Sequence, residues 1–202
     1  MYIWWYGWYL GLTRRFDESL EVMKRAQEFD PLSHLIGFGV GAIYFWSGQS
    51  ERAIDQLQRV VELNPNFRLA YSYLAEAYLE KGDFASAIAT FDNAPIALND
   101  PISLSAAAYV YAKAGDRHKA LKILNELEKQ SSQEYAPAVH IAQIYVGLGD
   151  NEQAFAWLEK ACDERSVWLI WLGVDPTFNP LRSNPRFEDL LRRVGLPQSF
   201  DN

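Results

Sequence analysis

The chain repeats itself at a nearly constant interval, and this period limits its possible folds more than any other feature. Glycine follows a run of helix-forming residues at Gly48, Gly82, Gly115 and Gly149, in steps of 34, 33 and 34 residues. A weaker copy precedes these, with Arg14 in the place of the glycine. Three further columns keep the spacing: Tyr44, Tyr78, Tyr111 and Tyr145; Ala53, Ala87, Ala120 and Ala154; and Leu57, Phe91, Leu124 and Leu158. Such a period indicates stacked copies of one structural unit.

Each unit is predicted to be a pair of helices. Apolar residues recur at helical spacing on both sides of the glycine. In the third unit they are Tyr71, Leu74, Ala75 and Tyr78 before the glycine, and Phe84, Ala87, Ile88 and Phe91 after it. The glycine suits a left-handed residue that ends the first helix, and Asp83, Asp116 and Asp150 are placed to cap the second.

The third unit resembles the tetratricopeptide repeat almost position for position, through Tyr71-x2-Leu74-Ala75-x2-Tyr78 and then Ala87-x3-Phe91. The resemblance implies an all-α fold, a right-handed α-solenoid of about five helical hairpins with a C-terminal capping helix. The array is expected over residues 1–165, with units at about 1–33, 34–67, 68–100, 101–134 and 135–165, and the capping segment at 166–202. It further implies a non-catalytic scaffold that binds a protein or peptide on its concave surface.

The capping segment has its own pattern. Asn184 can cap a helix that has Pro185 at its first position, and Gly195 can end it. One face of this helix is predicted to be apolar and the other charged. The apolar residues are Phe187, Leu190, Leu191 and Val194, and the charged ones are Glu188, Asp189, Arg192 and Arg193. The tail resembles the segment that closes tetratricopeptide arrays in some bacterial multidomain regulators, which implies a C-terminal module of a larger regulator.

The N-terminal stretch from Tyr2 to Leu12 is nearly all apolar, yet it is too short to span a bilayer, which takes about 20 residues. In phase with the array, we expect Ile3, Tyr6, Gly7 and Leu10 to face the partner helix, and Trp4 and Trp8 to face the concave surface. This leaves a docking face of Tyr2, Trp5, Tyr9 and Leu12. Three occupants fit: a preceding repeat in a longer polypeptide, a second copy of the chain, or the body of the protein itself.

The resemblance also places the ligand, because tetratricopeptide proteins usually bind on the first helix of each unit. The residues carried over to that surface are Trp4, Trp8, Phe38, Phe45, Tyr73, Glu76, Tyr109, Lys113, His140 and Gln143. Chaperone-binding members of the family hold a C-terminal carboxylate with Lys, Asn and Arg in these rows. The corresponding positions of this chain hold Trp, Phe, Ser, Ala and Glu, so such peptides are not expected partners. Aromatic rows suit extended or polyproline peptides and apolar helices. The alternative is that these rings pack between adjacent units.

Composition excludes several other classes of function. The formal charge of −7 provides no basic field for nucleic acid, and 49% apolar residues exclude disorder. The single Cys162 fits a reducing compartment, so we expect a cytoplasmic protein. The three histidines are too scattered for a metal site, and we expect no cofactor. Glu76 and Glu80 share a helix face without an acid–base partner, and we expect both to be solvated.

The sequence therefore predicts a protein- or peptide-binding scaffold and not an enzyme. The alternative is a self-associating module whose main contact is the aromatic N-terminal helix. An unidentified protein or peptide, an upstream domain of the same polypeptide and a second copy of the chain are the expected partners, whereas membrane insertion is not expected.

Overall fold

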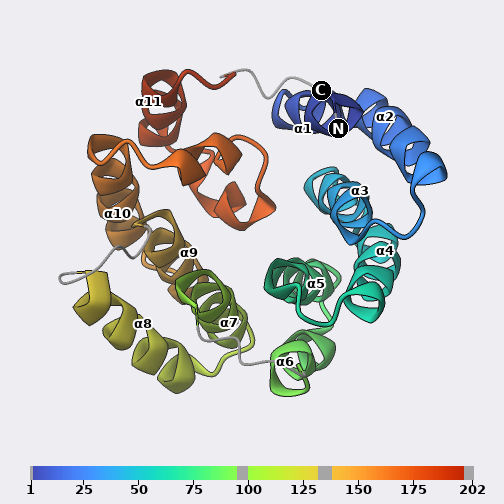
Figure 1. Ribbon diagram of the computed structural model, residues 1–202. Helices are drawn as coiled ribbons and strands as arrows, with labels where there is room; N and C mark the ends of the chain where they lie inside the picture. The colour runs from blue at the N-terminus through green and yellow to red at the C-terminus, as the bar shows by residue number, and fades with distance from the viewer. Residues whose placement is uncertain (1, 95–99, 132–137, 198–202) are drawn as a thin grey trace. The chain divides into compact units, whose positions relative to one another are not determined.

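The computed structural model describes residues 2–94, 100–131 and 138–197, and within these ranges all regular structure is helical. The chain divides into two compact units, Met1–Leu98 and Asn99–Asn202 (Figure 1). The first unit contains α1 (Tyr2–Leu12), α2 (Phe16–Phe29), α3 (His34–Trp46), α4 (Ser50–Leu63), α5 (Arg68–Glu80) and α6 (Phe84–Asp92). The second contains α7 (Pro101–Lys113), α8 (Arg117–Ser131), α9 (Ala138–Leu148), α10 (Asn151–Asp163), the 3₁₀ helices η1 (Val167–Trp171) and η2 (Pro176–Leu181), and α11 (Pro185–Val194).

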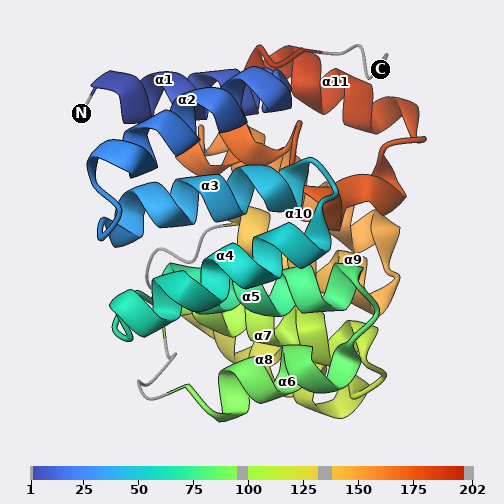
Figure 2. The ribbon, with the colours of Figure 1, turned by 90° about the vertical axis from the view of Figure 1, so that its right-hand side faces the viewer.

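Successive helices form hairpins that stack on one another. In the first unit α1 packs on α2, α3 on α4 and α5 on α6, while α2 contacts α3 and α4 contacts α5 (Figure 2). In the second unit α7 packs on α8 and α9 on α10, and α7 also packs along α9. The all-helical repeat fold predicted from the sequence period is therefore confirmed.

The turn between the helices of each hairpin has the predicted geometry. Gly48, Gly82, Gly115 and Gly149 all have positive φ, between 75° and 91°. Arg14 occupies the same place in the first hairpin with φ of 62°, so the weaker copy keeps the turn without the glycine. The predicted caps are present as well, since the carboxylates of Asp83, Asp116 and Asp150 accept hydrogen bonds from the backbone N–H of Ser86, Lys119 and Gln153.

Two of the columns that repeat along the chain have different roles in packing. The alanine column, Ala53, Ala87, Ala120 and Ala154, is fully buried and lets helices approach closely. Two residues of the tyrosine column join successive hairpins through their hydroxyl groups. The Gln58 side chain donates to the Tyr78 hydroxyl at 2.7 Å, from α4 to α5, and the Tyr145 hydroxyl donates to Glu128 at 2.7 Å, from α9 to α8.

The C-terminal helix α11 forms as the sequence predicts. Asn184 accepts a hydrogen bond from the backbone N–H of Arg186, Pro185 is the first helical residue, and Gly195 ends the helix with φ of 79°. Its apolar stripe is buried through Phe187, Leu190 and Leu191. None of the helices in the described part of the chain has the length and apolarity needed to cross a membrane.

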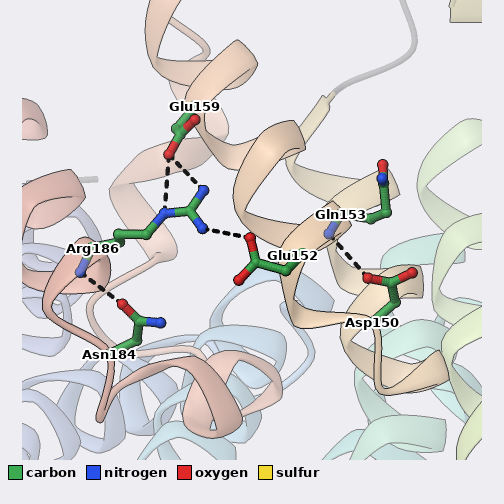
Figure 3. A network of polar contacts seen from close by, with 6 residues as sticks. All are labelled: Asp150, Glu152, Gln153, Glu159, Asn184 and Arg186. Atoms are coloured by element: carbon green, nitrogen blue, oxygen red, sulfur yellow. Dashed lines mark hydrogen bonds and ion pairs between the residues drawn. The ribbon is translucent and has the colours of Figure 1, made fainter.

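Arg186 fastens α11 to α10. Its guanidinium donates to Glu159 at 2.8 Å and to Glu152 at 2.9 Å (Figure 3). It also lies over the ring of Phe155, at 4.4 Å from the ring centroid. The two carboxylates raise the pKa of Arg186, so it stays charged. Because all three charged groups are partly exposed, the ion pairs orient α11 more than they stabilise it.

Candidate protein-binding surface

The predicted binding residues lie on α1, α3, α5, α7 and α9, and we call the face formed by these helices within each unit the first-helix surface. In the first unit this surface contains a chain of packed aromatic rings. Ring centroids are 5.7 Å apart between Trp4 and Trp8, 6.0 Å between Trp8 and Phe38, and 5.0 Å between Phe38 and Tyr73. Phe45 also contacts Tyr73, at 5.6 Å. The pairs are tilted or edge-to-face, which is the arrangement that aromatic quadrupoles favour.

These contacts bury most of the rings. Trp8, Phe38 and Phe45 are 7%, 4% and 1% exposed, whereas Trp4 and Tyr73 are partly exposed. The rings of Trp8, Phe38 and Phe45 therefore pack α1, α3 and α5 together. A ligand on this part of the surface would contact the edges of Trp4 and Tyr73.

The sequence pattern missed one member of the aromatic chain. Phe67 lies in the loop before α5 and packs against Phe38 at 5.2 Å and against His34 at 5.2 Å. It falls outside the helical columns, so periodicity could not assign it to this surface. Its position directly before an aromatic-rich helix is the one signal that could have suggested the contact.

The polar part of this surface is less exposed than predicted. Glu76, expected to be solvated, is 5% exposed within α5, whereas Glu80, one turn later, is exposed as expected. The expectation for Glu76 was wrong because α5 is covered on the side that carries this residue, and helical spacing alone does not show which turns a neighbour covers. Ser72 lies one turn earlier, and its buried hydroxyl has no hydrogen-bond partner.

In the second unit the chain covers its own first-helix surface. The 3₁₀ helix η2 packs on α9, and the ring of Trp168 in η1 meets the ring of His140 in α9 at 4.9 Å. Tyr109 and Gln143 are 2% and 6% exposed, while Lys113 at the end of α7 is exposed. The residues predicted in this unit therefore differ sharply in their access to solvent.

His140 is the most strongly perturbed group on this surface. Burial lowers its pKa from 6.5 to about 4, and this effect outweighs a hydrogen bond to Gln143 and the charge of Asp100, which act in the opposite direction. Its Nε2 atom is buried without a hydrogen-bond partner. The imidazole is therefore neutral at pH 7 and serves as a packing group beneath Trp168.

The N-terminal helix α1 contacts α2 through a narrower strip than predicted. Gly7 and Leu10 are buried there, and the Ser19 hydroxyl donates to the Gly7 carbonyl at 2.7 Å. Ile3 and Tyr6, expected to face the partner helix, are 45% and 50% exposed. The reason is that α2 sits directly over the glycine, where a Cβ would lie 2.8 Å from Cγ of Met23, which leaves the larger residues at the edge.

The docking face predicted on the same helix is exposed where the structure describes it. Trp5 and Tyr9 are 62% and 57% exposed and Leu12 is partly exposed, while the side chain of Tyr2 lies outside the described residues. Among the described residues no group of three or more His, Cys, Asp or Glu side chains is arranged to hold a metal ion. Cys162 is partly buried, and burial raises the pKa of its thiol.

Comparison with known proteins agrees with this architecture. Family models described as tetratricopeptide repeat match residues 43–100 and 138–166. A TPR repeat-containing protein of Pseudomonas aeruginosa is 40% identical over 53 residues, which are 26% of this chain and 50% of that protein. The formate-dependent nitrite reductase complex bifunctional subunit NrfFG of Haemophilus influenzae is 28% identical over 130 residues, 59% of this chain and 34% of that protein. The chain thus spans a third to a half of the length of these curated relatives.

Solved structures show the same fold. A tetratricopeptide repeat protein from Parabacteroides merdae aligns with a TM-score of 0.62 and 16% identity, over 96% of this chain and 76% of that one. The crystal structure of MamA protein aligns with a TM-score of 0.52 and 23% identity, over 79% of this chain and 87% of that one.

Proposed function

Because this chain belongs to the tetratricopeptide repeat family, we propose that it is a non-catalytic scaffold that binds a protein or peptide on its first-helix surface. The observation that carries the proposal is the repeat itself, which places first helices side by side within each unit, α1, α3 and α5 in the first and α7 and α9 in the second. The pKa shifts of two potential catalytic groups support binding over catalysis. His140 is neutral and packed, and burial raises the pKa of the Cys162 thiol away from the reactive range.

The accessible members of the predicted set are the proposed contact residues. These are Trp4 and Tyr73 in the first unit and Lys113 in the second. The buried members form the floor beneath them and hold their positions: Trp8, Phe38, Phe45, Glu76, Tyr109 and Gln143, with His140 beneath Trp168. Two partly exposed aromatic edges favour an apolar or proline-containing segment in the first unit, and the Lys113 ammonium favours an acidic one in the second.

A second part of the proposal concerns the larger protein and the cellular compartment in which this scaffold acts. We propose that the chain acts as the C-terminal module of a larger bacterial regulator in the cytoplasm. Its tail supports this, because α11 presents a buried apolar stripe and a charged outer face that close a helical array. The two curated relatives are bacterial, which supports the bacterial part of this setting. The single, unpaired Cys162 fits a reducing compartment.

A display selection tests the binding surface. Peptides selected against the full chain should lose at least tenfold in affinity on Tyr73→Ser if they bind the first unit, or on Lys113→Glu if they bind the second. Arg59→Ala on α4 and Lys122→Ala on α8 are matched controls, because both residues are exposed on second helices. Peptides that bind both surface variants as tightly as the original chain, and lose affinity with a control, would contradict the assignment.

Self-association through α1 is the second candidate. The specific observation in its favour is that four large apolar side chains of one helix, Ile3, Trp5, Tyr6 and Tyr9, are 45–62% exposed. Burying one such side chain stabilises a protein by about 1.5 to 3 kcal/mol, so a free state that leaves all four in water is disfavoured. The two candidates use neighbouring surfaces of the first unit, because the ring centroids of Trp4 and Trp5 lie 4.7 Å apart.

A further inference from the structure

The exposed side chains of α1 form one uncharged stripe. Tyr9 lies four residues after Trp5 and three after Tyr6, and the rings of Tyr6 and Tyr9 are stacked at 6.4 Å with an interplanar angle of 19°. Ile3 flanks them. No residue from Tyr2 to Leu12 is acidic or basic, although the chain as a whole carries −7. Two copies could therefore approach through this stripe without bringing like charges together.

The last helix of the array has the opposite character. On α11 the exposed side chains include Glu188, Arg192 and Arg193, and Arg193 pairs with Asp163 of α10 at 3.1 Å. An aromatic stripe placed against this helix would remove those charges from water without new partners, which is unfavourable. Head-to-tail contact between the first and last helices of two copies is thus disfavoured, and the stripe matches another stripe of its own kind.

We propose that two copies of this chain form a closed dimer, in which their α1 helices pair across a two-fold axis. This rests on the self-association candidate above and specifies its geometry. An isologous contact uses the same patch on both copies, so no patch remains to add a third copy.

The area available sets the strength of this dimer. With about 200 Å² for a whole aromatic side chain, the exposed parts of the four side chains amount to roughly 400 Å² per copy. Specific interfaces bury about 800 Å² per partner, so the stripe supplies the apolar centre of a small interface. We therefore expect a weak, reversible dimer. Because the stripe is uncharged and the copies repel through their net charge, higher salt should strengthen it, whereas it would weaken a contact made of ion pairs.

Sedimentation velocity of the full chain over a range of micromolar concentrations tests the proposal. We expect a monomer–dimer equilibrium without larger species, shifted toward dimer by added salt. Trp5→Glu and Tyr9→Glu should each raise the dissociation constant at least tenfold. Phe29→Ser is the matched control, because Phe29 is 75% exposed at the end of α2 and its loss should leave the dimer unchanged. Circular dichroism checks that each variant remains helical.

Three results would overturn the dimer. One is a monomer at every concentration, another is a series of species that grows beyond two copies, and the third is a dimer that the α1 substitutions do not weaken. If the chain is monomeric but sediments with phosphatidylcholine vesicles, and Trp5→Glu abolishes this, the stripe is a membrane contact and the proposal is wrong. Peptide binding by Trp5→Glu separates the two proposals, since binding through Tyr73 or Lys113 should survive the loss of the dimer.

Discussion

The left-handed turn residue of each hairpin allows a clean test of how the repeat is stabilised. Gly82 has φ of 83°, and a Cβ added there would meet no other atom within 4 Å. Gly82→Ala therefore changes backbone energetics without a steric clash. A non-glycine residue in this conformation costs about 1–2 kcal/mol, and alanine recovers part of this by restricting the unfolded chain, so we expect a net loss of about 1 kcal/mol.

The first hairpin supplies the reciprocal experiment. Arg14 already occupies the left-handed position, with φ of 62°, so Arg14→Gly should stabilise the protein. The gain is smaller than the loss at Gly82, roughly 0.5 kcal/mol, because the guanidinium lies over the Phe16 ring at 5.9 Å and that contact is lost. The two substitutions are thus expected to have opposite signs at equivalent positions of the repeat.

Urea unfolding followed by circular dichroism measures both changes. Gly82→Asn is the matched control, because asparagine tolerates the left-handed region and should cost less than alanine. The reasoning fails if Gly82→Ala is as stable as the original chain, if asparagine costs as much as alanine, or if Arg14→Gly is destabilising.

Three further substitutions test contacts described above. The folded pKa of His140 lies below its unfolded value of 6.5, so its contribution to stability is complete above pH 6.5 and is lost as the pH falls toward 4. By about pH 5 the loss is roughly 2 kcal/mol, and His140→Gln should remove this contribution when urea unfolding is compared at about pH 7 and about pH 5. Arg186→Met should cost about 1 kcal/mol or less in thermal unfolding, and should increase hydrogen exchange in α11 without affecting α9. Ser19→Ala leaves the Gly7 carbonyl without its buried donor and should destabilise α1 by about 1–2 kcal/mol, measured by hydrogen exchange over residues 2–12.

Local rules predicted the hairpins because each rule acts within a few residues. The left-handed Gly82, the Asp83 cap and the Asn184–Pro185 start of α11 all depend on backbone geometry that neighbouring residues determine. The alanine column was equally accessible, since a residue that recurs once per repeat has the same neighbours in each copy.

The exposure of the candidate binding residues could not be predicted in the same way. Tyr73 and Tyr109 are both predicted on the binding surface of first helices, yet the first is partly exposed and the second is buried. Tyr109 is buried where α7 packs along α9, since a Cβ on Gly147 would lie 2.9 Å from its ring. The first-helix surface of α9 is covered by η1 and η2, which carry no repeat signal and pack on it, η1 through Trp168. Periodicity assigns a residue to a helix face, but what covers that face depends on segments outside the period.

The tryptophans of the first unit have a spectroscopic consequence. The indole rings of Trp4 and Trp8 are 5.7 Å apart, and those of Trp8 and Trp46 are 5.3 Å apart. Transition dipoles at such separations and tilted orientations couple, so the far-ultraviolet circular dichroism of the folded chain should contain an exciton couplet. Trp8 belongs to both pairs, and its replacement by phenylalanine would remove their contribution and leave that of Trp4 and Trp5, whose rings are 4.7 Å apart within α1. The first unit therefore carries an unlabelled optical reporter of the packing between α1 and α3.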